Sequence, residues 1–142
     1  MADELILIVE DNEKNLKLVR DLLQVKGYRT LDAGTAELGV ELARRHTPQL
    51  ILMDIQLPGM DGVAALGQLK GRPSMAKIPV VALTAFAMKD DQQRLRAVGF
   101  DGYLVKPINI RELLEVVREW CERHHSHLGP FPGREGKELG DP

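Results

Sequence analysis

Two uninterrupted apolar runs, at residues 5–9 and 50–53, most constrain the fold of this chain. A run this short, with no polar residue to face solvent, is typical of a strand that is covered on both faces. Acidic residues follow each run directly: Glu10 and Asp11 after the first, and Asp54 after the second. The two runs therefore predict a parallel sheet with carboxylates at the ends of two buried strands.

Helical and strand patterns alternate along the rest of the chain. Apolar residues at helical spacing predict helices over residues 12–26, 36–45, 63–70, 89–98 and 109 to about 123. Further strands are predicted over residues 28–33, 79–83 and 102–105, with the more polar first of these at a sheet edge, and residues 71–79 are interpreted as a polar loop. Five strand–helix units in succession predict an α/β fold with helices on both faces of a parallel sheet.

Length and charge limit the domain organisation and the partners. The 142 residues suit one domain, which we place at residues 1–124. Residues 125–142 contain four glycines and three prolines and are interpreted as a flexible tail. A formal net charge of −2 gives no reason to expect nucleic-acid binding. Because no apolar run approaches the roughly 18 residues of a membrane span, we expect no membrane partner.

The sequence favours a cytoplasmic location. The acidic start of the chain lacks the basic flank of a signal peptide. The single cysteine, Cys121, cannot form an intramolecular disulfide, which fits a reducing compartment. Cys121 falls within a helical pattern, so we interpret it as a packing residue.

Polar residues follow four of the five predicted strands at the point where each strand ends. They are Glu10, Asp11, Asp54, Thr84 and Lys106. Each has an ordinary structural explanation, such as helix capping for the acids. The carboxyl ends of parallel strands meet in one crevice, however, so five such residues at matching positions favour a shared site.

The chemistry of that residue set favours phosphoryl transfer. Neighbouring carboxylates raise one another's pKa, and a divalent cation removes this repulsion. Mg²⁺ prefers hard oxygen ligands, and it usually takes one or two carboxylates and keeps several waters. A cation, a lysine and a hydroxyl around one carboxylate allow that carboxylate to act as a nucleophile toward phosphorus.

These residues resemble the receiver domain of two-component response regulators, over residues 4 to about 124. The runs at residues 53–62 and 83–88 are similar to single-domain receivers of the cell-cycle regulator type and to receivers attached to hybrid histidine kinases. The resemblance implies a flavodoxin-like three-layer sandwich of five βα units with strand order 2-1-3-4-5. It also implies a signalling phosphoprotein in a phosphorelay rather than an enzyme, which a histidine kinase or histidine phosphotransfer protein phosphorylates.

The resemblance also assigns the phosphoryl and metal site. Asp54 is the phosphoacceptor. Asp11, Asp54 and the backbone carbonyl of Gln56 bind Mg²⁺, and Glu10 acts through a water on the metal. Lys106 and Thr84 hold the phosphoryl oxygens.

By the same resemblance, phosphorylation is read out through Thr84 and Tyr103, which form a two-state switch. From the residues themselves we expect the output surface to consist of the helix from Lys89, the strand at Tyr103 and the helix from Asn109, because it adjoins both switch residues and the Lys89 helix has few apolar anchors. We expect this surface to bind a downstream protein or a second copy of the chain. Hydrolysis of the phosphoryl group is tuned by the residues two positions after Asp54 and Thr84, namely Gln56 and Phe86.

Other functions fit the sequence less well. A haloacid-dehalogenase-type phosphatase needs a second aspartate two residues after its nucleophile, where Gln56 stands. A nucleotide or flavin module would need a glycine-rich loop after the first strand, and none is present. Met1 lies just before the first strand and the tail is polar, which favours a free-standing receiver over a fragment of a hybrid kinase. A phosphate sink that signals to no partner is the remaining alternative.

Overall fold

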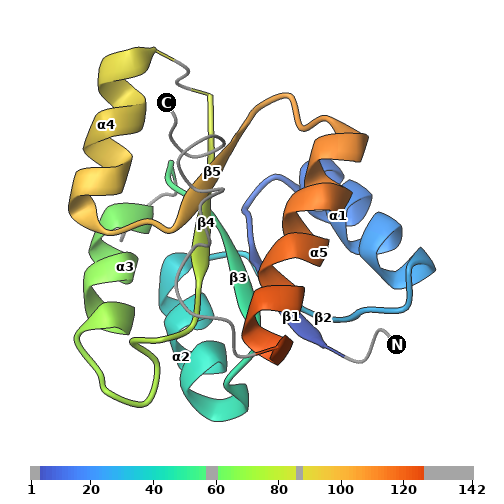
Figure 1. Ribbon diagram of the computed structural model, residues 1–142, viewed down its shortest axis with the longest axis horizontal. Helices are drawn as coiled ribbons and strands as arrows, with labels where there is room; N and C mark the ends of the chain where they lie inside the picture. The colour runs from blue at the N-terminus through green and yellow to red at the C-terminus, as the bar shows by residue number, and fades with distance from the viewer. Residues whose placement is uncertain (1–3, 57–60, 86–87, 127–142) are drawn as a thin grey trace.

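The computed structural model describes residues 4–56, 61–85 and 88–126. These residues form strands and helices in strict alternation (Figure 1). The strands are β1 (Leu5–Val9), β2 (Arg29–Ala33), β3 (Leu50–Asp54), β4 (Val80–Thr84) and β5 (Gly102–Val105). The helices are α1 (Glu13–Val25), α2 (Ala36–His46), α3 (Gly62–Lys70), α4 (Lys89–Val98) and α5 (Ile110–Ser126).

The five strands form one parallel sheet in the order β2-β1-β3-β4-β5. This order confirms the predicted flavodoxin-like topology. The more polar strand β2 lies at one edge, as expected from its sequence, and β3 lies at the centre. All five residues of β3 are buried, which explains why its run contains no polar residue before Asp54.

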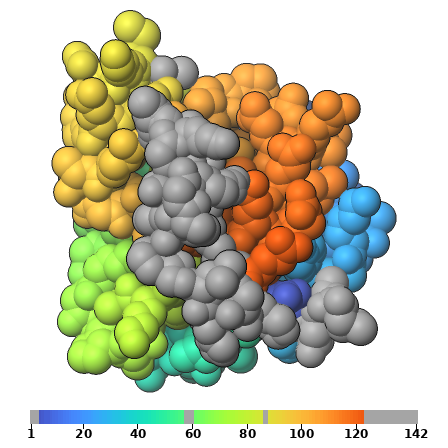
Figure 2. Space-filling view, viewed as in Figure 1, coloured from blue at the N-terminus to red at the C-terminus, as the bar shows by residue number. Residues whose placement is uncertain are grey.

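Two separate hydrophobic layers cover the sheet. Alternate residues of β1 point to opposite faces: Leu7 and Val9 pack beneath α2, α3 and α4, whereas Ile6 and Ile8 pack beneath α1 and α5. Figure 2 shows the surfaces of α3 and α4 along one side of the molecule and those of α1 and α5 along the other. The central strands therefore need apolar residues at every position, because both of their faces are buried.

Local signals in the sequence set most of the helix boundaries. Asn12, Thr35 and Asp61 cap the starts of α1, α2 and α3, each side chain accepting a hydrogen bond from a backbone N–H. Gly27 and Gly99 follow α1 and α4 with φ angles of 95° and 117°, a region that favours glycine.

The structure corrects the sequence interpretation at one loop and at one helix boundary. The loop at residues 71–79 is not simply polar, because Met75 is fully buried in the core and Ile78 is nearly so. Helix α5 continues to Ser126, past the predicted end near residue 123 and into the predicted tail. The rest of that tail, residues 127–142, lies outside the described residues.

Candidate functional site

The sheet brings the predicted site residues to one end. In the parallel register Val9 pairs with Met53, Asp54 with Leu83, and Thr84 with Val105, so the strands end at nearly the same level. Glu10 and Asp11 follow β1, Asp54 and Thr84 end β3 and β4, and Lys106 follows β5.

Three carboxylates form the centre of the site. One oxygen of each of Glu10, Asp11 and Asp54 lies within 4.8 Å of the others. The side chains differ in exposure: Glu10 and Asp54 are only 1% and 2% exposed, whereas Asp11 is exposed. The cluster thus has a buried floor and one acid at its opening.

Lys106 partly neutralises the buried floor. Its Nζ lies 2.9 Å from Asp54 Oδ2 and 3.2 Å from Glu10 Oε1. The backbone N–H of Lys106 donates to the carbonyl of Thr84 at 2.7 Å, which fixes the start of the segment after β5. The other Asp54 oxygen, Oδ1, accepts a hydrogen bond from the Gln56 N–H at 2.9 Å. Both oxygens of Asp54 therefore have a donor.

Burial and charge perturb the groups around Asp54. Burial raises the pKa of Glu10 above its usual value, and the close contact and repulsion with Asp54 raise it further. The Asn12 N–H, which donates to Glu10 Oε2 at 3.1 Å, and the charge of Lys106 only partly oppose this. For Lys106, burial lowers the pKa, but the contacts with Asp54 and Glu10 outweigh it and raise the pKa overall. The site thus contains more buried negative charge than Lys106 alone compensates.

The residues present fit a divalent cation. Glu10 Oε1 is buried and has no hydrogen-bond partner, although Lys106 Nζ lies 3.2 Å away, outside hydrogen-bonding geometry. Three carboxylates with converging oxygens supply the hard oxygen ligands that Mg²⁺ prefers. A cation here would also offset the remaining negative charge.

The predicted switch and tuning residues have different surroundings. Thr84 is fully buried at the end of β4. Tyr103 is half-buried and packs against the hydrophobic layer beneath α2, α3 and α4. Gln56 is exposed beside Asp54, and Phe86 lies outside the described residues.

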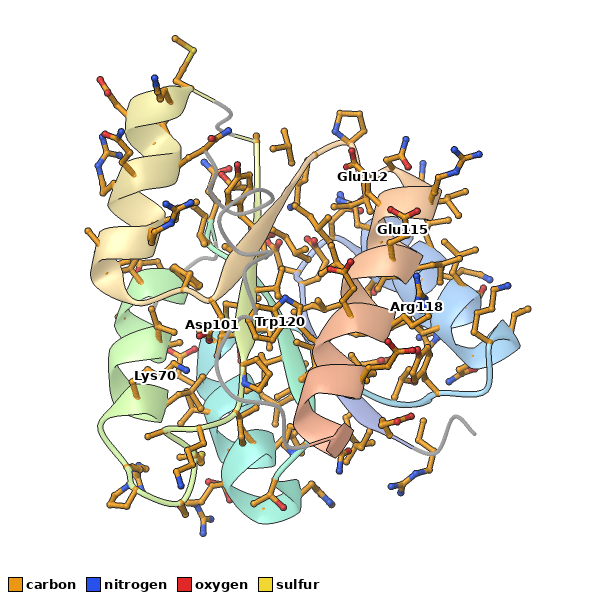
Figure 3. The ribbon with its side chains drawn as sticks, in the orientation of Figure 1. Lys70, Asp101, Glu112, Glu115, Arg118 and Trp120 are labelled. Atoms are coloured by element: carbon orange, nitrogen blue, oxygen red, sulfur yellow. The ribbon has the colours of Figure 1, made fainter. Side chains whose placement is uncertain are left out.

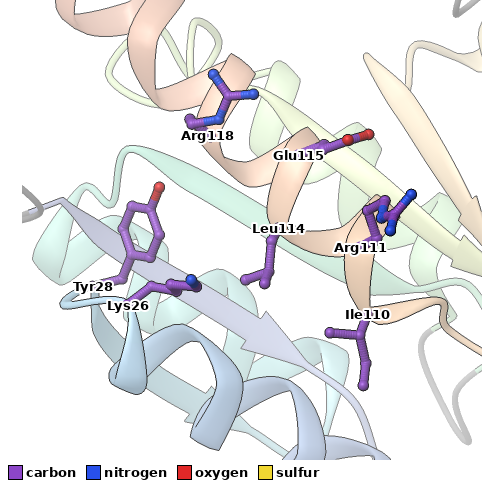
Figure 4. Close-up of a pocket in the computed structure, with 7 residues that line it drawn as sticks. All are labelled: Lys26, Tyr28, Ile110, Arg111, Leu114, Glu115 and Arg118. Carbon is purple, nitrogen blue, oxygen red and sulfur yellow. The ribbon is translucent and has the colours of Figure 1, made fainter.

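A hollow lies between α5 and the segment that follows α1, away from the carboxylates. It measures about 670 Å³, and its lining combines apolar side chains with three basic residues and one acid (Figure 4). Its lining residues are Lys26, Tyr28, Ile110, Arg111, Leu114, Glu115 and Arg118. None of them belongs to the carboxylate site.

Fold and site together define an α/β protein with an aspartate-centred cluster of carboxylates, a candidate cation site, at the carboxyl end of a parallel sheet. Residues 6–118 match the response regulator receiver domain family. The chain therefore belongs to the response regulator receiver family of two-component signalling.

Relatives in sequence and structure agree with this membership. The chain is 44% identical over 115 residues to the polar-differentiation response regulator DivK of Brucella ovis, covering 81% of this chain and 94% of that protein. The receiver domain of a Pseudomonas aeruginosa sensor histidine kinase, solved with a magnesium ion in its active-site cleft, is 32% identical with a TM-score of 0.78, over 85% of this chain and 99% of that one. Chemotaxis protein CheY4 of Vibrio cholerae is 26% identical with a TM-score of 0.78, over 83% and 98%.

Proposed function

We propose that Asp54 accepts a phosphoryl group from a phosphohistidine of a histidine kinase or histidine phosphotransfer protein. The observation that carries this proposal is a buried carboxylate held between Lys106 Nζ and the Gln56 N–H, beside two further acids. In the reaction an Asp54 oxygen attacks phosphorus and the P–N bond breaks. The electron pair of that bond returns to the imidazole, and an acyl phosphate forms on Asp54.

The surrounding residues have distinct roles in this proposal. Asp11, Asp54 and the backbone carbonyl of Gln56 would hold Mg²⁺, with Glu10 acting through a water. When bound, Mg²⁺ supplies positive charge next to the phosphoryl oxygens. Lys106 already contacts Asp54 and remains beside the new phosphoryl group as its counter-charge, and the Thr84 hydroxyl donates to another phosphoryl oxygen.

The test is the incorporation of phosphate from acetyl phosphate, a small phosphodonor, followed by intact-mass analysis. Asp54→Asn keeps the size of the side chain but removes the nucleophile, so we expect wild-type protein to gain a phosphoryl group only with Mg²⁺ and the variant to gain none. Asp61→Asn, at the exposed cap of α3, is the matched control. Phosphorylation of the Asp54→Asn variant at the wild-type rate would refute the proposal.

The output proposed for this site is a change in protein binding through the face formed by α4, β5 and α5. Leu95 is the one buried residue of α4 and Met88 before it is 72% exposed, so moving this helix disturbs little of the core. Thr84 and Tyr103 would shift with phosphorylation, and Gln56 and Phe86 would set the hydrolysis rate. A cytoplasmic kinase, a downstream protein or a second copy of the chain would read the change.

Binding to the cognate partner with and without beryllofluoride tests this output. We expect the affinity to change on activation and charge reversal at Arg94 to alter it. Equal affinities in both states, with no effect of Arg94→Glu, would instead indicate a phosphate sink.

Among the helices that the structure describes, none has the length and apolar character to cross a membrane.

A further inference from the structure

Gly62, the first residue of α3, lies against the backbone of the strand that carries Asp54. A Cβ atom at this position would lie 2.6 Å from the Cα of Ile55 and 2.7 Å from the carbonyl oxygen of Asp54. Both are backbone atoms, so no side-chain rotation could relieve the contact. Gly62 does not have a left-handed φ angle, so space rather than backbone conformation excludes a side chain here.

Hydrogen bonds connect this contact to the carboxylate site. The Gly62 N–H donates to the carbonyl of Ile55 at 3.3 Å, and the Ile55 N–H donates to the carbonyl of Leu83 in β4 at 3.2 Å. One residue further, the Gln56 N–H donates to Asp54 Oδ1 at 2.9 Å. Residues 54–56 are thus held between β4 on one side and the start of α3 on the other.

From this arrangement we infer that Gly62 is a positioning residue for the Asp54 site. Its missing side chain allows α3 to begin directly against residues 54–56, and this contact sets the direction of the Asp54 carboxylate and of the Gln56 carbonyl. A Cβ would force the backbone of Asp54 and Ile55 and the start of α3 apart. The inference rests on the proposed phosphoacceptor function, and it adds a residue that touches neither phosphate nor metal.

The experiment compares Gly62→Ala with Gly67→Ala. Gly67 lies in the same helix, and a Cβ there meets nothing within 4 Å, so the two variants make the same chemical change with and without the backbone contact. Three quantities are measured: the rate of phosphorylation by acetyl phosphate, the Mg²⁺ dissociation constant from calorimetry, and the folded fraction from circular dichroism. Rates are normalised to the folded fraction, so that a loss of stability alone does not alter them.

For Gly62→Ala we expect phosphorylation to slow by about 10- to 100-fold, because misplacing a reacting group by an ångström can cost 100-fold. Mg²⁺ binding should weaken at least roughly threefold, since the Asp54 carboxylate and the Gln56 carbonyl move together. Gly67→Ala should change the phosphorylation rate and the Mg²⁺ affinity by less than about twofold, since its Cβ meets no other atom and alanine is a better helix former than glycine. If wild-type protein is phosphorylated on Asp54 but Gly62→Ala matches its rate and Mg²⁺ affinity, the positioning role is wrong and the proposed function stands.

A poorly folded Gly62→Ala protein is measured in trimethylamine N-oxide, an osmolyte that favours compact states. Slower phosphorylation and weaker Mg²⁺ binding of the folded protein there would support the inference. A variant that stays unfolded under these conditions, while Gly67→Ala folds normally, would overturn it, because Gly62 would then be required for the fold as a whole. Wild-type protein that takes no phosphate on Asp54 would refute the proposed function itself, whatever the variants do.

Discussion

At the scale of single residues, the site holds Glu10 in an unfavourable environment. Its carboxylate is buried beside Asp54, and burial together with that neighbour raises its pKa. The folded protein therefore keeps a proton on Glu10 at pH values where the unfolded chain has already released it. The free energy of unfolding should thus fall as pH rises from 4.5, the ordinary pKa, through the raised pKa of the folded state.

We predict that Glu10→Gln stabilises the metal-free protein. At pH 7 in the presence of a chelator, the free energy of unfolding should rise by about 1 kcal/mol, because the substitution removes a buried negative charge beside Asp54 and single stabilising substitutions commonly contribute that much. The fall in stability between pH 4.5 and 7 should also become shallower. Urea unfolding at several pH values measures both effects. An unchanged pH profile would show that Glu10 has no raised pKa in the folded protein.

At the scale of elements, α2 approaches β1 closely at Gly39. A Cβ at this position would lie 2.7 Å from Cγ2 of Val9, the last residue of β1 before Glu10. Valine is branched at Cβ and fully buried here, so it cannot rotate away without disturbing its neighbours.

We predict that Gly39→Ala destabilises the fold by roughly 1–3 kcal/mol, the usual cost of overpacking a core. Helix propensity alone would predict the opposite change in stability, because alanine stabilises an exposed helix position relative to glycine. Gly67→Ala in α3 has open space and should be neutral or stabilising in the same denaturation experiment. Equal effects of the two substitutions would mean that α2 does not pack this closely on β1.

Lys70 at the end of α3 joins three separate segments. Its Nζ donates to the carbonyls of Ala76 and Ile78 at 3.2 and 3.0 Å and to Asp101 Oδ2 at 3.1 Å (Figure 3). The same Asp101 oxygen accepts the N–H of Val80 at 2.8 Å. One lysine thus links α3, the loop before β4 and the turn before β5.

We predict that Lys70→Met lowers the free energy of unfolding by about 1–2 kcal/mol. This is less than the full value of several charged hydrogen bonds, because the side chains of Lys70 and Asp101 are each roughly a quarter exposed and solvent weakens their interaction. Lys77→Met, an exposed lysine in the same loop, is the control and should have little effect. Chemical denaturation distinguishes the two. A loss that is no larger for Lys70→Met than for the control would contradict the proposed link.

At the scale of the whole molecule, the structure describes a hydrophobic layer on each face of the sheet. The layer beneath α2, α3 and α4 and the layer beneath α1 and α5 are built from residues between Ile6 and Cys121. We therefore predict that deleting residues 127–142 changes the free energy of unfolding by less than about 0.5 kcal/mol. Denaturation and acetyl phosphate labelling of the shortened protein test this domain boundary. A larger loss of stability would place part of the core contacts in the deleted segment.

Patterns within the chain were enough to predict the alternation of elements, the parallel sheet and the set of residues at its carboxyl end. These follow from local signals: apolar runs buried on both faces, capping residues such as Asn12, and glycines at left-handed positions such as Gly99. Such signals depend on the chemistry of neighbours in the chain, so they can be read without the fold.

Folding itself was needed to define which atoms meet across the site. The contact of Lys106 with both Asp54 and Glu10 joins segments that lie far apart in the chain, and the missing side chain of Gly62 matters only because α3 returns onto β3. The aspartate–glycine pair at residues 61–62 indicates a turn or helix start in the sequence, and the closeness of Ile55 is invisible there. Met75 lies in a segment with a polar sequence, and only the folded structure shows that it is buried in the core. Burial and contact are properties of segments brought together by folding, and no local pattern encodes their distance.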